Sequence, residues 1–187
     1  MRKPYQRIVS LRTNWDTEEY LGFRPDSHDW ARLAAYVDGE GSINLTPRRT
    51  NSAETITFCA KVVVTNTDFR LADWCLRTFG MKFYSKNTAW GGDRAERWKD
   101  CYYAQACGYK ASWILRNCLE WFILKGAQAE VVLAHQRTIG PDVWKRGPGV
   151  TTPQNILDIR ASLKSKLAEL NRRGPKPDSV TKKVMEA

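Results

Sequence analysis

The sequence lacks any segment that would cross a membrane or direct secretion. Its 187 residues contain no run approaching the 18 apolar residues of a transmembrane helix, and no apolar stretch follows the basic N-terminus. The five cysteines are odd in number and form no C-x-x-C pair, so neither a disulfide framework nor a zinc ribbon is predicted. We therefore expect an intracellular protein with reduced thiols and no membrane partner.

Acidic residues are scarce relative to basic ones. Twenty Asp and Glu stand against 30 Lys and Arg, which gives a formal net charge of +10 and favours a polyanionic partner. Eight Trp, seven Tyr and six Phe argue for a packed fold rather than a disordered basic chain. The length suits one domain, or one domain with a tail. We expect an N-terminal arm over 1–27, a core over 28–146, and a linker, helix and basic tail over 147–187.

The most informative segment is LAAYVDGEG, residues 33–41. The apolar residues around it recur at the spacing of one helix face: Trp30, Leu33, Ala34 and Val37. Gly39 and Gly41 then end the predicted helix. Asp38 and Glu40 fall at its C-terminal end, where the helix dipole disfavours negative charge unless a cation compensates. Magnesium or calcium is the natural candidate because both take oxygen ligands.

After Gly41 the pattern changes to the alternation of two β-strands. The first strand alternates Ser42, Asn44, Thr46 and Arg48 with Ile43 and Leu45. The second alternates Thr57, Cys59, Lys61, Val63 and Thr65 with Ile56, Phe58, Ala60, Val62 and Val64. The two predict a hairpin with one apolar and one largely polar face. On pattern alone, that polar face is equally an ordinary solvated surface or a β-ribbon that reads the DNA major groove.

The remaining segments complete an ordered series of elements. Asn66-Thr67-Asp68 supplies caps for a helix to Phe79, ended by Gly80. A strand pair is predicted over 82–85 and 100–106, joined by a loop that contains Trp90 and Trp98. This loop either contacts DNA or packs its Trp side chains beneath it. Helices are predicted over 110–121 and 124–137, and a last one from Thr152-Pro153 with an apolar stripe of Ile156, Ile159, Leu163, Leu167 and Leu170.

Residues 33–41 resemble the signature of the LAGLIDADG homing endonucleases, and the element order matches that family's αββαββα core over roughly 28–139. The Leu-Lys-x-x-Gln-Ala segment from Leu124 resembles the family's element that carries a basic active-site residue. The resemblance implies an α+β fold with a saddle-shaped antiparallel sheet. It also implies a nuclease that cleaves double-stranded DNA with Mg²⁺, with Mn²⁺ or Ca²⁺ able to substitute in binding.

The resemblance assigns roles residue by residue. Glu40 matches the essential metal-binding acid, Gly39 offers a backbone carbonyl, and Asp38 is a secondary metal ligand or a cap. Asn66 resembles the residue that positions water, although it is equally a helix cap. The basic pocket residues correspond to Arg70, which is otherwise a solvated helix residue, and Lys125. The candidate DNA contacts are Ser42, Asn44, Thr46, Arg48, Arg49, Thr57, Cys59, Lys61, Val63 and Thr65.

Only one motif is present, so one chain carries half of a site. The resemblance implies a homodimer whose motif helices pack through Leu33, Ala34, Ala35, Val37 and Asp38, on a nearly palindromic target cut to leave short 3′ overhangs. The rivals are an intron maturase, a DNA-binding regulator on the same scaffold, or a generic basic RNA-associated protein. Retention of Glu40 argues against pure binding, because a groove reader has no use for an acid at the phosphate.

Overall fold

The computed structural model describes residues 22–49, 56–86, 100–139 and 152–172, without the side chains of Arg49, Ile56 and Lys86. The helices are α1 (Ser27–Glu40), α2 (Phe69–Phe79), α3 (Tyr109–Cys118), α4 (Gly126–Arg137) and α6 (Gln154–Leu170), with a 3₁₀ turn η3 (Leu119–Trp121). The strands are β1 (Gly41–Arg49), β2 (Ile56–Asn66), β3 (Lys82–Lys86) and β4 (Cys101–Cys107). The predicted element order and α+β class are confirmed.

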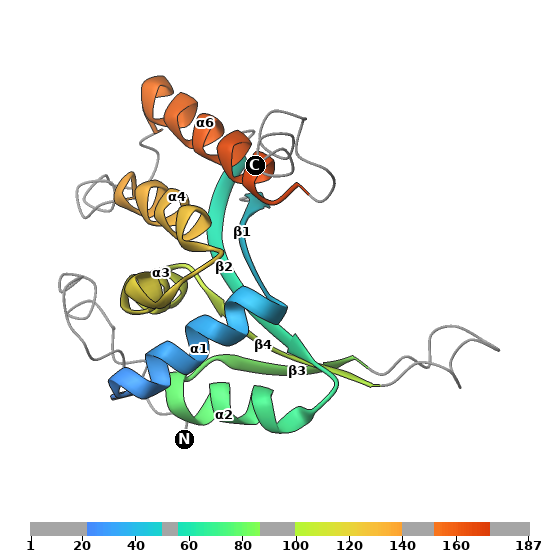
Figure 1. Ribbon diagram of the computed structural model, residues 1–187. Helices are drawn as coiled ribbons and strands as arrows, with labels where there is room; N and C mark the ends of the chain where they lie inside the picture. Colours follow the sequence, from blue (N-terminus) through green and yellow to red (C-terminus); the bar gives the residue numbers. More distant parts are fainter. Residues whose placement is uncertain (1–21, 50–55, 87–99, 140–151, 173–187) are drawn as a thin grey trace, which may run out of the picture.

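The four strands form one antiparallel sheet in the order β1-β2-β4-β3. The sheet is curved, and α1, α3 and α4 lie together on one side of it (Figure 1). The side chains that face these helices are buried, among them Ile43, Leu45, Ala60, Val62, Val64, Ala104 and Ala106. The alternation predicted for the hairpin therefore separates a core face from an open face.

Helix α1 begins and ends through specific local contacts. Asp26 and Asp29 cap its first turn reciprocally, each side chain accepting a hydrogen bond from the other's backbone N–H at 2.8 and 3.3 Å. At its other end Gly41 starts β1 so close to the helix that an added Cβ would lie 2.6 Å from the Cα of Val37 and 3.0 Å from the carbonyl oxygen of Val63. The chain can turn directly from helix to strand because position 41 has no side chain.

The C-terminal half differs from the prediction in two details. The helix predicted over 110–121 ends at Cys118 and continues as η3. The helix predicted from Leu124 begins at Gly126, because the N–H groups of Ile123, Leu124 and Lys125 donate to the Asp38 carboxylate and hold that stretch in a loop.

Helix α6 packs along α4 with a different face from the one predicted. Leu167 is buried, as expected, but Ile159 and Leu170 are exposed. Arg160 is buried instead, since its guanidinium donates to the hydroxyl and carbonyl oxygens of Thr138 at 2.9 Å. Because Arg160 is bound to Thr138, the face of α6 that packs on α4 differs from the apolar stripe predicted from the sequence.

Several expectations fall outside the described ranges. They concern most of the predicted arm, the Trp90–Trp98 loop, the linker before residue 152 and the tail after residue 172. Within the described part, no helix has the length and apolarity needed to span a bilayer.

Candidate active site

Glu40 lies at the junction of α1 and β1, where the helix meets the sheet. It is the last residue of α1 and its side chain is exposed. Its Oε2 accepts a hydrogen bond from Nδ2 of Asn66, the last residue of β2. The hairpin thus brings together two of the predicted catalytic residues, which are 26 positions apart in the chain.

Arg70 joins the same cluster through Asp68. The Oδ1 of Asn66 accepts from the backbone N–H of Asp68 at 2.8 Å, so Asn66 also braces the start of α2. Asp68 caps that helix and binds the Arg70 guanidinium, whose Nε lies 2.9 Å from Oδ2. These hydrogen bonds from Arg70 lower the pKa of Asp68 to about 2. Glu40 and Asp68 each have a formal charge of −1 and Arg70 has a formal charge of +1. The cluster therefore has a net negative formal charge, which suits a cation.

Asp38 binds the loop before α4. Its Oδ2 accepts from the backbone N–H groups of Ile123 and Leu124 at 2.7 and 3.1 Å, and its Oδ1 accepts from that of Lys125 at 2.9 Å. Both carboxylate oxygens are therefore turned to the loop before α4. Asp38 therefore anchors that loop, a contact that the sequence did not predict, and its role in metal binding stays a prediction.

Lys125 returns the contact by capping α1. Its ammonium group donates to the carbonyl oxygens of Val37, Asp38 at 2.7 Å and Gly41 at 3.0 Å. The positive charge sits at the negative end of the α1 dipole, where it is stabilising. Lys125 thus lies near the Glu40 cluster, as predicted, but its ammonium group is directed at the backbone of the motif helix.

The oxygen donors near Glu40 fit one end of a magnesium site. Lys125 donates to the carbonyl oxygens of Asp38 and Gly41, which come before and after those of Gly39 and Glu40 in the chain. No atom lies within 4 Å of the position that a Cβ of Gly39 would take. Among the described side chains, no group of three or more His, Cys, Asp and Glu could hold a metal ion. Mg²⁺ is commonly bound by one or two carboxylates completed by water and substrate phosphates. The exposed carboxylate of Glu40 is a donor of this kind, and the carbonyl of the preceding residue, Gly39, is a second oxygen donor adjacent in the chain.

The open sheet face begins beside Glu40 and carries the predicted polar rows. The strand register pairs Ser42 with Val63, Asn44 with Lys61, Thr46 with Cys59 and Arg48 with Thr57. Thr65 extends the polar row of β2 toward Asn66. Arg49 is also a predicted DNA contact, but its side chain is outside the part of the chain that the structure describes. Burial raises the pKa of the Cys59 thiol, and neighbouring Cys107 acts in the same direction. Cys59 is therefore a neutral member of the face.

The face also continues across β4 and β3, which the sequence reasoning did not assign. Thr65 pairs with Tyr103, which pairs with Tyr84, and the two tyrosine rings stack at 5.2 Å. Val63 pairs with Gln105, which pairs with Lys82. The alternation of KFYSK and CYYAQAC carries this signal, but reading it requires knowing that β4 lies beside β2.

Comparison with solved structures identifies the arrangement. No family model matches the sequence, and no curated protein is detectably similar to it. The structure resembles that of the homing endonuclease I-CvuI in complex with its target, with a TM-score of 0.61 and 20% identity over 86% of this chain and 92% of that one. The chain has the LAGLIDADG homing endonuclease fold.

Two further structures with the LAGLIDADG fold extend the comparison. The archaeal intron-encoded homing endonuclease I-Vdi141I, complexed with DNA, matches with a TM-score of 0.59 and 13% identity over 81% of this chain and 89% of that one. The LAGLIDADG homing endonuclease I-SmaMI, bound to cleaved DNA, matches with a TM-score of 0.55 and 13% identity over 83% of this chain. This chain covers 48% of I-SmaMI.

The outer face of the motif helix differs from the predicted interface. Leu33, Ala34 and Val37 are 0% exposed, so they fill the core of their own chain and leave no side-chain surface for a partner. In the second half of α1, the small residues that remain exposed are Ala35 and Gly39. Beside this end of α1, the loop anchored by Asp38 exposes two large apolar side chains, Ile123 at 90% and Leu124 at 69%.

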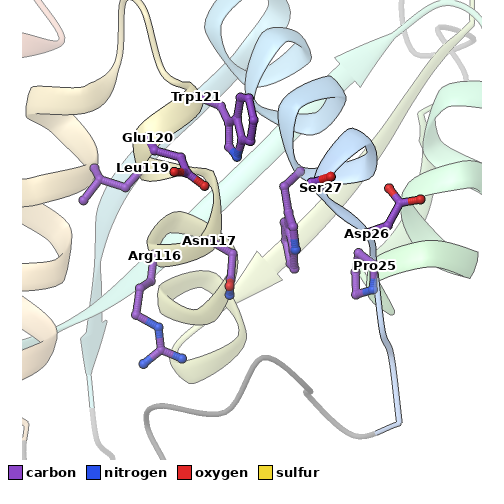
Figure 2. Close-up of a pocket in the computed structure, with 9 residues that line it drawn as sticks. Pro25, Asp26, Ser27, Arg116, Asn117, Leu119, Glu120 and Trp121 are labelled. Atoms are coloured by element: carbon purple, nitrogen blue, oxygen red, sulfur yellow. The ribbon is translucent and has the colours of Figure 1, made fainter.

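A cavity of about 670 Å³ lies at the opposite end of α1. Figure 2 shows it between the start of α1 and the end of α3. Its lining residues are Pro25, Asp26, Ser27, Trp30, Arg116, Asn117, Leu119, Glu120 and Trp121. Because α1 has 14 residues and a helix rises about 1.5 Å per residue, the two ends of α1 are roughly 20 Å apart. The cavity is therefore separate from the Glu40 cluster.

Proposed function

We propose that the protein is a site-specific endonuclease that hydrolyses the phosphodiester backbone of double-stranded DNA with the help of Mg²⁺. The observation that carries the proposal is the placement of Glu40. An exposed acid, held by Asn66, stands where the motif helix meets a curved sheet whose open face is polar and basic. The similar structures of homing endonucleases, one in complex with its target and one bound to cleaved DNA, support the same activity.

Each part of the chain has a task in this reaction. Glu40, with the Gly39 carbonyl, would hold the ion, which when bound activates water and stabilises charge on the phosphate. Asn66 orients the Glu40 carboxylate by donating to Oε2. Arg70, 79% exposed at the rim of the cluster, can attract the DNA backbone while its pairing with Asp68 fixes its position. The open sheet face places the duplex by contacts to base edges and phosphates.

The single acid implies that two copies act together. One Glu40 cluster serves one strand, so a double-strand break requires a second copy, and a two-fold axis then implies a nearly palindromic target. Ala35 and Gly39 leave room for two motif helices to approach, and Ile123 and Leu124 supply apolar surface beside them. The fact that the chain covers 48% of I-SmaMI fits the view that it is half of a complete site. We infer short 3′ overhangs as the product.

A cleavage selection tests the proposal directly. Purified protein is incubated with a randomised double-stranded DNA library in Mg²⁺, and the cleaved ends are sequenced, with EDTA as the blank. We expect one nearly palindromic site, cut in both strands. Glu40→Gln should yield no cleaved ends, whereas Glu130→Gln, an exposed glutamate of α4, should behave as wild type. Enrichment by binding with no cleavage in Mg²⁺ or Mn²⁺ would instead indicate a DNA-binding regulator.

A further inference from the structure

The C-terminal end of α6 touches the strand that opens the polar face. Asn171, the residue that follows α6, donates through Nδ2 to the carbonyl oxygen of Ile43 at 2.9 Å and to Oδ1 of Asn44 at 3.3 Å. Asn44 and Asn171 are 127 positions apart, so this contact depends on tertiary packing. Figure 1 shows the last turn of α6 beside β1, the edge strand of the sheet.

The contact fixes the orientation of the Asn44 amide. The carbonyl of Ile43 accepts only, so the group of Asn171 that faces it must be the NH₂. The second hydrogen of that NH₂ points to Asn44, so an acceptor of Asn44 must face Asn171. The oxygen of the Asn44 amide is therefore directed at Asn171, and its NH₂ is directed away.

Asn171 is exposed, but the helix end that carries it is tied to the body of the protein. Gln128 of α4 donates to the carbonyl oxygen of Leu170 at 3.3 Å, and the neighbouring Leu167 is 1% exposed. Further along α6, Arg160 is tied to Thr138 at the end of α4. The end of α6 is thus fixed from both α4 and β1, as a residue that positions another must be.

We propose that Asn171 is a positioning residue for DNA sequence preference, which it sets by presenting the Asn44 amide to the major groove as a hydrogen-bond donor. This inference rests on the proposed function, in which the open face of β1 reads DNA. A donor at this point is satisfied by guanine N7 or O6, adenine N7 or thymine O4, whereas cytosine presents only the N4 donor in the major groove. Cytosine is therefore the disfavoured base opposite Asn44.

The first test needs no DNA. The order parameter of the Asn44 side-chain amide, measured by ¹⁵N NMR relaxation, should fall in Asn171→Ala and stay unchanged in Asn155→Ala, which removes an exposed Asn from the other end of the same helix. Equal thermal unfolding midpoints would show that the fold is intact. An Asn44 amide equally ordered in Asn171→Ala and in wild type would overturn the proposal.

The second test profiles bound sequences from a randomised library. Asn171→Ala should reduce discrimination against cytosine about two- to tenfold at one base pair of each half-site, the one altered by Asn44→Ala, because one neutral hydrogen bond sets that range. The double variant should be no worse than either single one. Asn171→Asp, which can only accept, should turn the Asn44 oxygen outward and favour adenine or cytosine there.

The outcomes separate this inference from the proposed function. An even loss of affinity at all positions would reduce Asn171 to a structural role and overturn the inference. If Asn171→Ala and wild type select the same site with the same base preferences, the inference about Asn171 is overturned, whereas the proposed nuclease function stands. A wild-type protein that enriches no sequence would overturn the proposed function itself.

Discussion

Replacing Asp38 by Asn should destabilise the fold, while replacing Glu40 by Gln should abolish cleavage and leave the fold intact. The two acids are two residues apart on the last turn of α1, but their partners differ. Asp38 accepts from three backbone N–H groups of the loop before α4. Glu40 is exposed and accepts from the Asn66 side chain. A matched pair of isosteric amide substitutions therefore separates the two roles.

The magnitude for Asp38 follows from its three hydrogen bonds. An Asn at this position keeps one acceptor oxygen, so its NH₂ must face at least one backbone N–H. One charge-assisted bond is lost and the others weaken, which costs about 2–3 kcal/mol for a partly exposed group. For a chain of this size that loss corresponds to a fall of about 4–12 °C in the unfolding midpoint. A Gln at position 40 can still accept from Asn66, so its effect on stability should stay within about 0.5 kcal/mol.

The assays are thermal unfolding, cleavage in Mg²⁺ and DNA binding in Ca²⁺, all at one protein concentration. Glu40→Gln should unfold like wild type and bind DNA within about tenfold of wild type, because the acid serves the ion rather than base readout. Asp38→Asn should retain cleavage at a temperature well below its midpoint. Cleavage by purified Glu40→Gln, or an unchanged midpoint in Asp38→Asn, would refute the assignment of these carboxylates.

Three further outcomes follow from other parts of the structure. Gly41→Ala should destabilise the fold because its Cβ would meet backbone atoms at 2.6 to 3.0 Å, whereas Gly39→Ala should fold normally and lose dimerisation, as read by melting and sedimentation. Ile123→Glu should convert a dimer into the 21.5 kDa monomer, and a wild-type monomer both free and on DNA would contradict the assembly. Burial lowers the pKa of His135 from 6.5 to about 4. As the pH falls, the unfolded chain therefore binds the proton before the folded protein does. The free energy of unfolding should then drop by about 3 kcal/mol between pH 6.5 and 4. Denaturant unfolding should show this drop in wild type and in the exposed-site variant His28→Gln, but not in His135→Leu.

Local periodicity was sufficient to predict α1 and the hairpin. The spacing of Leu33 and Val37 required one buried face, and the alternation of β1 and β2 required another. The ends of α2 were also predictable from local sequence. Asp68 caps its start and Gly80 caps its end, each by contacts within a few residues. Once the hairpin is closed, Glu40 and Asn66 must meet.

The contacts that distinguish roles within the site lie too far apart in the sequence for such reasoning. The anchoring of Asp38 crosses more than 80 positions, and that of Asn44 crosses 127. Periodicity also shows which residues share a face without showing what covers it. Leu33, which the sequence assigned to contact with a partner helix, is covered by the core of its own chain.

The charge problem posed by two acids at a helix C-terminus is resolved separately for each of them. Asp38 is stabilised by backbone N–H groups, and Lys125 places its ammonium on the carbonyls of the same helix end, so the dipole and the first acid need no ion from outside. The partner of Glu40, in contrast, is the neutral amide of Asn66. Glu40 is thus an exposed carboxylate at the negative end of a helix, and the described partner that orients it carries no positive charge. Because Lys125 compensates the helix terminus, Glu40 is the acid at this junction that remains available for the proposed ion, at the point where the polar sheet would present a DNA phosphate.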